Sequence, residues 1–290
     1  MNLRKSALIF LFLLASIIYP QEQNYYFSFL PPGLHFIPLR ANMQEARIGT
    51  LYYPDNSDLK LDIGNDVDIF GFSWSKEKID LTLGVEFMAY ALATSYSGMR
   101  LQIDALDGFF GGTASFSKAF DRNVLQIRGR IIHNSAHMVD GHYDFSKNEW
   151  IDDLRPIPIS RNFGEITLAD KYDEGNYLLR YYGSAAYTIL TFPDDQKKYS
   201  FALGFELNSN KIIGKIFGKE TNLFCAYQLS IHGISVYAGD NHIMTGIKFG
   251  GWDDKGIALY LSYFTGNDYF SEYYYKRIEK IGIGISIDFI

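Results

Sequence analysis

Apolar and polar residues alternate with a period of two in several stretches of this sequence. Near the chain end, Ile281, Ile283, Ile285, Ile287 and Phe289 share one parity, and glycine, serine and aspartate occupy the other. The same alternation occurs over 59–64, 79–87 and 199–208. Because successive side chains of a β-strand point to opposite faces, this pattern predicts strands with one apolar face. The chain is therefore expected to be all-β.

The residues at the polar positions of this alternating pattern help to choose between a soluble β-sandwich and a β-barrel in lipid. A sandwich turns its polar face to water and favours Lys, Glu and Thr there. Here those positions hold many Gly, Ser and Ala residues, as the crowded interior of a barrel requires. Aromatic residues gather near the expected strand ends at 52–53, 70–74, 181–182 and 273–275, which is typical of membrane interfaces. We predict a transmembrane antiparallel β-barrel. The alternative is a soluble periplasmic β-protein, which would be extracted without detergent.

The expected barrel has about twelve strands, within a range of roughly 10 to 14. The strands are expected at 46–53, 58–73, 78–92, 99–118, 123–134, 160–170, 176–192, 198–209, 221–237, 242–250, 255–266 and 278–290. A barrel of this size has a narrow lumen, in which charges of both signs would pair. The charged residues expected there are Asp62, Asp66, Asp68, Glu86, Arg128, Arg130, Arg180, Glu206 and Lys248.

The beginning of the chain predicts export. Arg4 and Lys5 precede an apolar run over 7–19, which is the pattern of a cleaved signal peptide at 1–20. The run is shorter than the roughly 20 apolar residues that span a bilayer, although an uncleaved anchor is the alternative. Residues 21–45 are expected to form a lead-in segment, either periplasmic or folded into the lumen, and 46–290 the barrel. The predicted location is the outer membrane of a Gram-negative bacterium.

Composition excludes several classes of function. The formal net charge is −6 and there is no basic block, so nucleic acid is a poor candidate partner. The single Cys225 excludes a disulfide framework and a multi-cysteine metal site. No phosphate loop or dinucleotide fingerprint is present, and we expect no cofactor. The expected partners are outer-membrane lipid and, during insertion, the barrel-assembly machinery; the sequence leaves the oligomeric state open.

One segment carries candidate catalytic residues. His133, His137 and His142 lie within ten positions of one another. By the parity of the strand over 123–134, His133 and Ser135 face lipid. A histidine that takes the proton of a serine hydroxyl makes the serine nucleophilic, and a third group holds the imidazole. Asp140 or Asp144 can be that group. This constellation predicts a lipid-ester hydrolase acting on the outer leaflet, beneath a long loop at 136–159.

Other interpretations of the segment remain open. Ser and His at the mouth of a barrel can be interfacial polar residues without a chemical role. A zinc site from His133, His137 and Asp140 is disfavoured, because histidine ligands four apart suit a helix better than a strand. The chain can also be a non-enzymatic barrel. It would then be a narrow pore, or an anchoring or adhesion scaffold whose contact surface is the loop at 136–159.

The step from His133 to Ser135 resembles that of the outer-membrane phospholipase A and the lipid A 3-O-deacylases. Those enzymes carry a catalytic His and Ser two residues apart on the outer surface of a barrel. The resemblance implies that His133 is the base and Ser135 the nucleophile. The acid or Asn partner that those families place further along has no clear counterpart in this sequence.

A broader resemblance covers much of the mature chain. Residues 38–42 and 133–140 are similar to two segments of a family of exported bacterial proteins of unknown function. One segment of the family is Pro-Leu-x-Ala-Asp-Pro-like and the other is His-x-Ser-Ser-His-x-x-Asp-like. Asn42, Met43 and Ala136 depart from these patterns. The resemblance implies the barrel architecture and the importance of the second segment, but no reaction.

Overall fold

The computed structural model describes residues 25–96, 100–136, 141–144, 146–233 and 236–289. The predicted signal peptide at 1–20 lies outside these residues. In the part of the chain that is described, helical structure is limited to two 3₁₀ turns, η1 (Ile151–Asp153) and η2 (Ser271–Tyr273). No helix in that part is long and apolar enough to cross a membrane.

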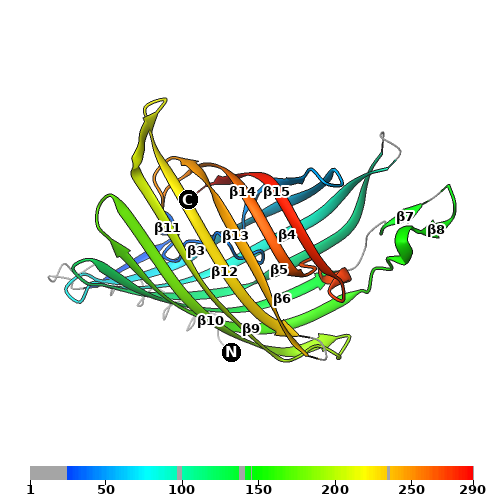
Figure 1. Ribbon diagram of the computed structural model, residues 1–290. Coiled ribbons are helices and arrows are strands. Elements are labelled where there is room, and N and C mark those ends of the chain that lie inside the picture. The colour runs from blue at the N-terminus through cyan, green and yellow to red at the C-terminus, as the bar shows by residue number, and fades with distance from the viewer. Residues whose placement is uncertain (1–24, 97–99, 137–140, 145, 234–235, 290) are drawn as a thin grey trace, which may run out of the picture.

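Twelve antiparallel strands close into a barrel, with strongly tilted strands wrapping around a common axis (Figure 1). The strands are β2 (Ile48–Tyr53), β3 (Asp58–Trp74), β4 (Ile79–Tyr96), β5 (Arg100–Ala119), β6 (Asn123–Ala136), β9 (Ile159–Asp173), β10 (Tyr177–Phe192), β11 (Tyr199–Ile216), β12 (Lys219–Gly233), β13 (Tyr237–Phe249), β14 (Gly256–Asn267) and β15 (Arg277–Asp288). Each strand pairs with the next along this series, and β15 pairs with β2 to close the ring. The predicted all-β barrel of about twelve strands is confirmed.

Three short strands lie outside this ring. β1 (Tyr25–Phe29) pairs with 70–74 of β3, on the edge of β3 whose other end, 58–62, pairs with β2. β7 (Tyr143–Asp144) and β8 (Glu149–Trp150) form a small hairpin that projects from the barrel (Figure 1). The sequence did not predict β1, because its residues YYFSF lack a clean alternation and sit within the expected lead-in segment.

The two ends of the barrel differ in their connections. One end carries both described termini and the connections at 75–78, 120–122, 174–176, 217–218 and 250–255; we call it the turn end. The other end carries the ends of the strand pairs β2–β3, β4–β5, β6–β9, β10–β11, β12–β13 and β14–β15; we call it the loop end. Short turns at one end and longer loops at the other are typical of outer-membrane barrels.

Alternation along each strand separates the two faces of the wall. On β15, Ile281 and Ile283 are more than half exposed on the outer face, whereas Ser286 is buried in the lumen. The same rule corrects part of the predicted aromatic girdle. Tyr53, Tyr182 and Tyr273 are buried, while their neighbours Tyr52 and Tyr181 are exposed. Adjacent tyrosines of one strand point to opposite faces, so each pair supplies one ring to the outer face.

Small residues in the lumen make room for the aromatic rings that fill it. Gly204 and Gly284 lie directly under the rings of Tyr182 and Tyr260. A Cβ at these glycines would stand 2.3 Å from Tyr182 Oη and 2.2 Å from Tyr260 Cζ. Such contacts are far inside van der Waals distance. Crowding by lumen side chains therefore accounts for glycine at these polar-parity positions.

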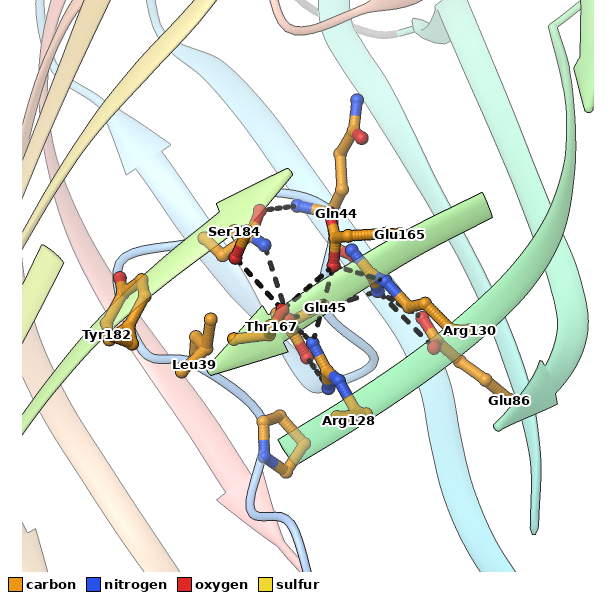
Figure 2. A network of polar contacts seen from close by, with 12 residues as sticks. Leu39, Gln44, Glu45, Glu86, Arg128, Arg130, Glu165, Thr167, Tyr182 and Ser184 are labelled. Carbon is orange, nitrogen blue, oxygen red and sulfur yellow. Dashed lines mark hydrogen bonds and ion pairs between the residues drawn. The ribbon is translucent and has the colours of Figure 1, made fainter. Parts of the chain in front are cut away.

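The chain between β1 and β2 lies inside the lumen, where Glu45 occupies the centre of a charge network (Figure 2). Arg128 Nη1 donates to Glu45 Oε2 at 2.7 Å, and Arg128 Nη2 donates to the other carboxylate oxygen. Arg130 joins Glu86 at 3.1 Å and Glu165 at 2.8 Å. All but Glu165 are almost completely buried. The lumen at this level is filled by paired charges.

Replacing Glu45 with alanine should destabilise the barrel. The change leaves Arg128 buried without its carboxylate partner, and breaking a buried pair in this way costs about 3–5 kcal/mol. We expect the urea midpoint of unfolding to fall, measured on the folded protein in detergent micelles. The matched control is Glu174→Ala, which removes an exposed glutamate paired with Arg122 and should leave the midpoint unchanged. Equal midpoints for Glu45→Ala and wild type would contradict the structural role of the network.

Candidate functional site

Three polar side chains form a cluster on the outer face of the wall. His133 and Ser135 come from β6, two residues apart and therefore on one face, and Asn162 comes from β9. Asn162 is the direct cross-strand partner of His133. On the other side of β6, Phe110 of β5 is also directly opposite His133, and the two ring centroids are 4.9 Å apart. We call His133, Ser135 and Asn162 the outer-wall cluster.

The hydrogen bond within this cluster fixes the state of the imidazole. His133 Nδ1 lies 2.6 Å from Asn162 Oδ1. An amide oxygen can only accept, so Nδ1 must carry the proton that it donates. In the neutral ring, Nε2 is then unprotonated and is the site that can accept a further proton. This is the tautomer that a general base beside a serine requires.

Ser135 stands next to open space on the same wall. Its cross-strand neighbour on β5 is Gly108, which has no side chain to cover it, and its neighbour on β9 is the exposed Ser160. Within the described residues, no hydrogen bond joins the Ser135 hydroxyl to His133. The cluster therefore has an oriented imidazole and, two residues along the same row, a half-buried serine hydroxyl.

The outer-wall cluster lies at the border of the apolar belt. Towards the turn end, the outward residues of β6 and β9 include Ile131 (68 % exposed) and Ile166 (64 % exposed). Towards the loop end, the same rows continue with His133 and Ser135 on β6 and with Asn162 and Ser160 on β9. The change from apolar to polar occurs at the same level on both strands. On the neighbouring β10, the residues paired with Asn162 and Ser160 are the exposed Leu190 and Phe192, so this change is confined to β6 and β9.

Asp144 and His142 make contacts elsewhere than with His133. Asp144 is buried in the β7–β8 hairpin, where its Oδ1 accepts hydrogen bonds from the backbone N–H groups of Ser146 and Lys147. His142 Nδ1 lies 2.6 Å from Asp104 Oδ2 of β5. Asp140 and His137 lie outside the described residues. Among the described residues, no group of three or more His, Cys, Asp or Glu side chains could hold a metal ion.

Asn162 is the residue of the cluster that the sequence analysis did not identify. It lies in the predicted strand 160–170, on the parity that carries Ile166 and Leu168 outward. A polar residue among the apolar outward positions of this strand was a signal that the sequence offered. The sequence did not show that Asn162 lies opposite His133, because that depends on the register between β6 and β9.

The loop between β14 and β15 packs into the mouth of the lumen at the loop end. Ser271 N donates to Asp107 Oδ2 at 2.9 Å, and Leu106 N donates to Glu272 Oε2 at 3.3 Å. Burial raises the pKa of Glu272 to about 7. Burial likewise raises the pKa of Asp268 to about 7. Both carboxyl groups of this loop therefore titrate near neutral pH.

Comparisons with known proteins identify a family and a fold. Residues 61–289 match the profile of a family described as "Protein of unknown function (DUF1207)". No match is found among curated protein sequences. The outer membrane phospholipase A from Escherichia coli is similar in structure, with a TM-score of 0.52 and 13 % identity over 84 % of this chain and 90 % of that chain.

Two further solved barrels are similar at lower scores. The beta domain of the Bordetella autotransporter BrkA gives a TM-score of 0.45 and 12 % identity, covering 83 % of this chain and 96 % of that chain. The Pseudomonas putida toluene transporter TodX gives a TM-score of 0.41 and 12 % identity, covering 80 % of this chain and 69 % of that chain. The phospholipase comparison shows that the fold is that of bacterial outer-membrane barrels.

The loop at the mouth should loosen as pH rises. Folded-state pKa values raised to about 7 mean that the packed loop holds Glu272 and Asp268 neutral. Stability that depends on the neutral forms is complete below the ordinary carboxyl pKa and is lost as pH rises towards 7. Hydrogen exchange, corrected for intrinsic rates, should show protection of amides in 268–276 falling about tenfold or more between pH 5 and pH 8.

Glu272→Gln is the matched control, because its amide is uncharged at both pH values. This variant should show a smaller change in protection than wild type. Protection that is the same at pH 5 and pH 8 in wild type would contradict the assignment.

Proposed function

The chain belongs to the DUF1207 family of proteins of unknown function, and we propose that it is a lipid-ester hydrolase in the outer membrane. In this proposal Ser135 is the nucleophile, His133 is the base and Asn162 orients His133. The single observation that carries this proposal is the 2.6 Å contact of His133 Nδ1 with Asn162 Oδ1, with Ser135 on the same lipid-facing row. Asn162 takes the role for which Asp140 and Asp144 were the candidates in the sequence.

The first half of the reaction forms an acyl-enzyme. Ser135 Oγ attacks the carbonyl carbon of a lipid ester while its proton passes to His133 Nε2. The tetrahedral intermediate collapses with cleavage of the ester C–O bond. The leaving alcohol, a lipid lacking one acyl chain, takes the proton from His133. Asn162 holds the imidazole throughout, because its amide oxygen accepts from Nδ1–H in both the neutral and the charged ring.

The second half releases the acyl chain. Water attacks the carbonyl carbon of the acyl-Ser135 ester and gives a proton to His133 Nε2. The intermediate collapses with cleavage of the bond to Ser135 Oγ, which takes that proton back. The products are one free fatty acid and the deacylated lipid, and the enzyme returns to its starting state.

The place of the cluster supports a membrane lipid as substrate. An ester of a bilayer lipid lies at the border of hydrocarbon and headgroups, and the outer-wall cluster lies where the outward residues of β6 and β9 change from apolar to polar. With the turn end in the periplasm, as short turns of such barrels are, the loop end and the cluster face the outer leaflet. The fold shared with a phospholipase from Escherichia coli adds an analogy and assigns no residue.

The principal test uses the purified protein folded in vesicles of phosphatidylethanolamine and, in a second arm, of lipid A. We expect release of fatty acid by wild type in one arm, detected by mass spectrometry. Ser135→Ala should lower the rate at least about a thousandfold, as loss of a nucleophile does. Asn162→Ala should lower kcat by a smaller factor, because it frees the ring without removing the nucleophile, and Asn162→Asp should restore part of it.

The matched control is Ser160→Ala, which removes the neighbouring outward serine on β9 and should keep wild-type activity. A fluorophosphonate should also label Ser135 in wild type but not in His133→Ala. No fatty acid release in either arm and no labelling, with all proteins shown to be folded, would retire the proposal.

A conductance measurement separates this function from that of a narrow pore. The buried network around Glu45 fills the lumen, so wild type should give no steady current in a planar bilayer. A stable current through wild type, unaffected by Ser135→Ala, would favour the pore instead.

A further inference from the structure

The lumen contains an open cavity at the loop end, on the opposite side of the wall from the outer-wall cluster. Its volume is about 160 Å³, and residues 41–44 of the chain between β1 and β2 form part of its lining. Hydroxyl and amide side chains from several strands line the rest, among them Ser184, Ser200, Gln228 and Ser230. The rings of Phe264 and Tyr269 also reach it. The cavity thus combines many hydrogen-bonding groups with two aromatic surfaces.

Two cations that line this cavity, Arg161 and the exposed Lys197, form no ion pair with a carboxylate in the described part of the chain. Arg161 of β9 lines the cavity, and its Nε donates to Asn134 Oδ1 at 3.0 Å. Its guanidinium carbon lies 5.0 Å from the centre of the Phe163 ring. Across the described residues, no hydrogen bond or ion pair involves Nη1 or Nη2. Four N–H donors of one planar group are therefore left for a ligand.

Four other lumen arginines have carboxylate partners, whereas Arg47 donates to backbone carbonyls. Arg180 pairs with Glu206 at 2.7 Å, Arg40 with Asp288 at 2.5 Å, and Arg128 and Arg130 with the network around Glu45. A guanidinium withdrawn from bulk water is normally matched by a carboxylate or phosphate, to which it donates two parallel hydrogen bonds. Arg161 lies near the carboxylates of Asp107 and Glu165, but among the described residues neither forms an ion pair with its guanidinium.

Three acids line the same cavity, and each takes part in other contacts. Asp268 Oδ1 accepts from the backbone N–H of Phe270 at 3.0 Å. Glu165 accepts from Arg130 Nε at 2.8 Å. Asp240 contacts His232 Nε2 at 3.0 Å, and its other oxygen accepts from the backbone of Asn267 at 2.8 Å. Figure 2 shows the side chain of Gln44 extending away from the charge network, and Gln44 also lines the cavity. The free hydrogen-bonding capacity of the cavity thus includes the guanidinium of Arg161, the ammonium of Lys197 and several neutral groups.

We propose that this cavity binds a small polyhydroxylated anion, whose carboxylate or phosphate pairs with Arg161 and whose hydroxyl groups meet the Gln and Ser side chains. The arrangement suits an acidic or phosphorylated sugar. Its apolar C–H face would pack on the aromatic rings. The site is separate from the ester-hydrolysing site, because Arg161 and Asn162 are consecutive on β9 and point to opposite faces of the wall.

Isothermal titration calorimetry on the full chain, folded in detergent micelles, tests the proposal. The probes are glucuronate, glucose 6-phosphate and neutral glucose at one fixed salt concentration. Wild type should bind at least one of the two anions about tenfold or more tighter than glucose. Whichever anion binds tighter identifies carboxylate or phosphate as the preferred group. Arg161→Gln should reduce the affinity for that anion to the level of glucose.

Two further variants separate loss of the site from loss of the fold. Ala202→Phe adds a ring to the cavity from β11 without touching Arg161, and it should also abolish anion binding. Ser135→Ala should bind the anion as wild type does. Each variant must show the gel mobility shift of a folded barrel on heating. Failure of wild type to bind either anion, equal affinity for glucose, or full binding by folded Arg161→Gln would overturn the proposal.

Discussion

Everything in this molecule depends on closing the ladder of backbone hydrogen bonds around the barrel. In lipid, an unpaired strand edge has no water to satisfy it, so the sheet must meet itself. Here the short β2 completes the ring between β15 and β3. β1 pairs with the same edge of β3 further towards the turn end. Because both neighbours of the segment 30–47 are held on one edge, the chain between them runs into the lumen, where Glu45 gathers the buried arginines.

The closed wall gives two chemically different surfaces from one sequence. Consecutive residues point to opposite faces, so His133 and Asn162 face outward while their neighbours Asn134 and Arg161 face the lumen and bond to each other. Two pairs on adjacent strands thus serve two separate proposed sites, one for a lipid ester and one for a small anion.

The alternation along β6 predicts some features of the candidate site but not others. The outward direction of His133 and Ser135 follows from the parity of β6, which the apolar residues Ile127 and Ile131 establish. The hydrogen-bond partner of the His133 imidazole does not follow from the strand pattern, since the sequence offered only acids nearby in the chain as candidates. Asp144 instead accepts hydrogen bonds from the turn of its own hairpin. Asn162, far along the chain, reaches His133 because β6 and β9 are neighbours.

The sequence by itself determined the all-β class, about twelve strands with nearly correct limits, and the two faces of the strands with clear alternation, because alternation is a property of neighbouring residues. It also indicated which charged residues would need partners in the lumen. Only the tertiary structure decided which partners they found, that β1 pairs with β3, and that Asn162 stands opposite His133. The reason is physical: contacts across strands depend on register, and register is set by the hydrogen bonds between strands of the closed barrel as well as by the local pattern.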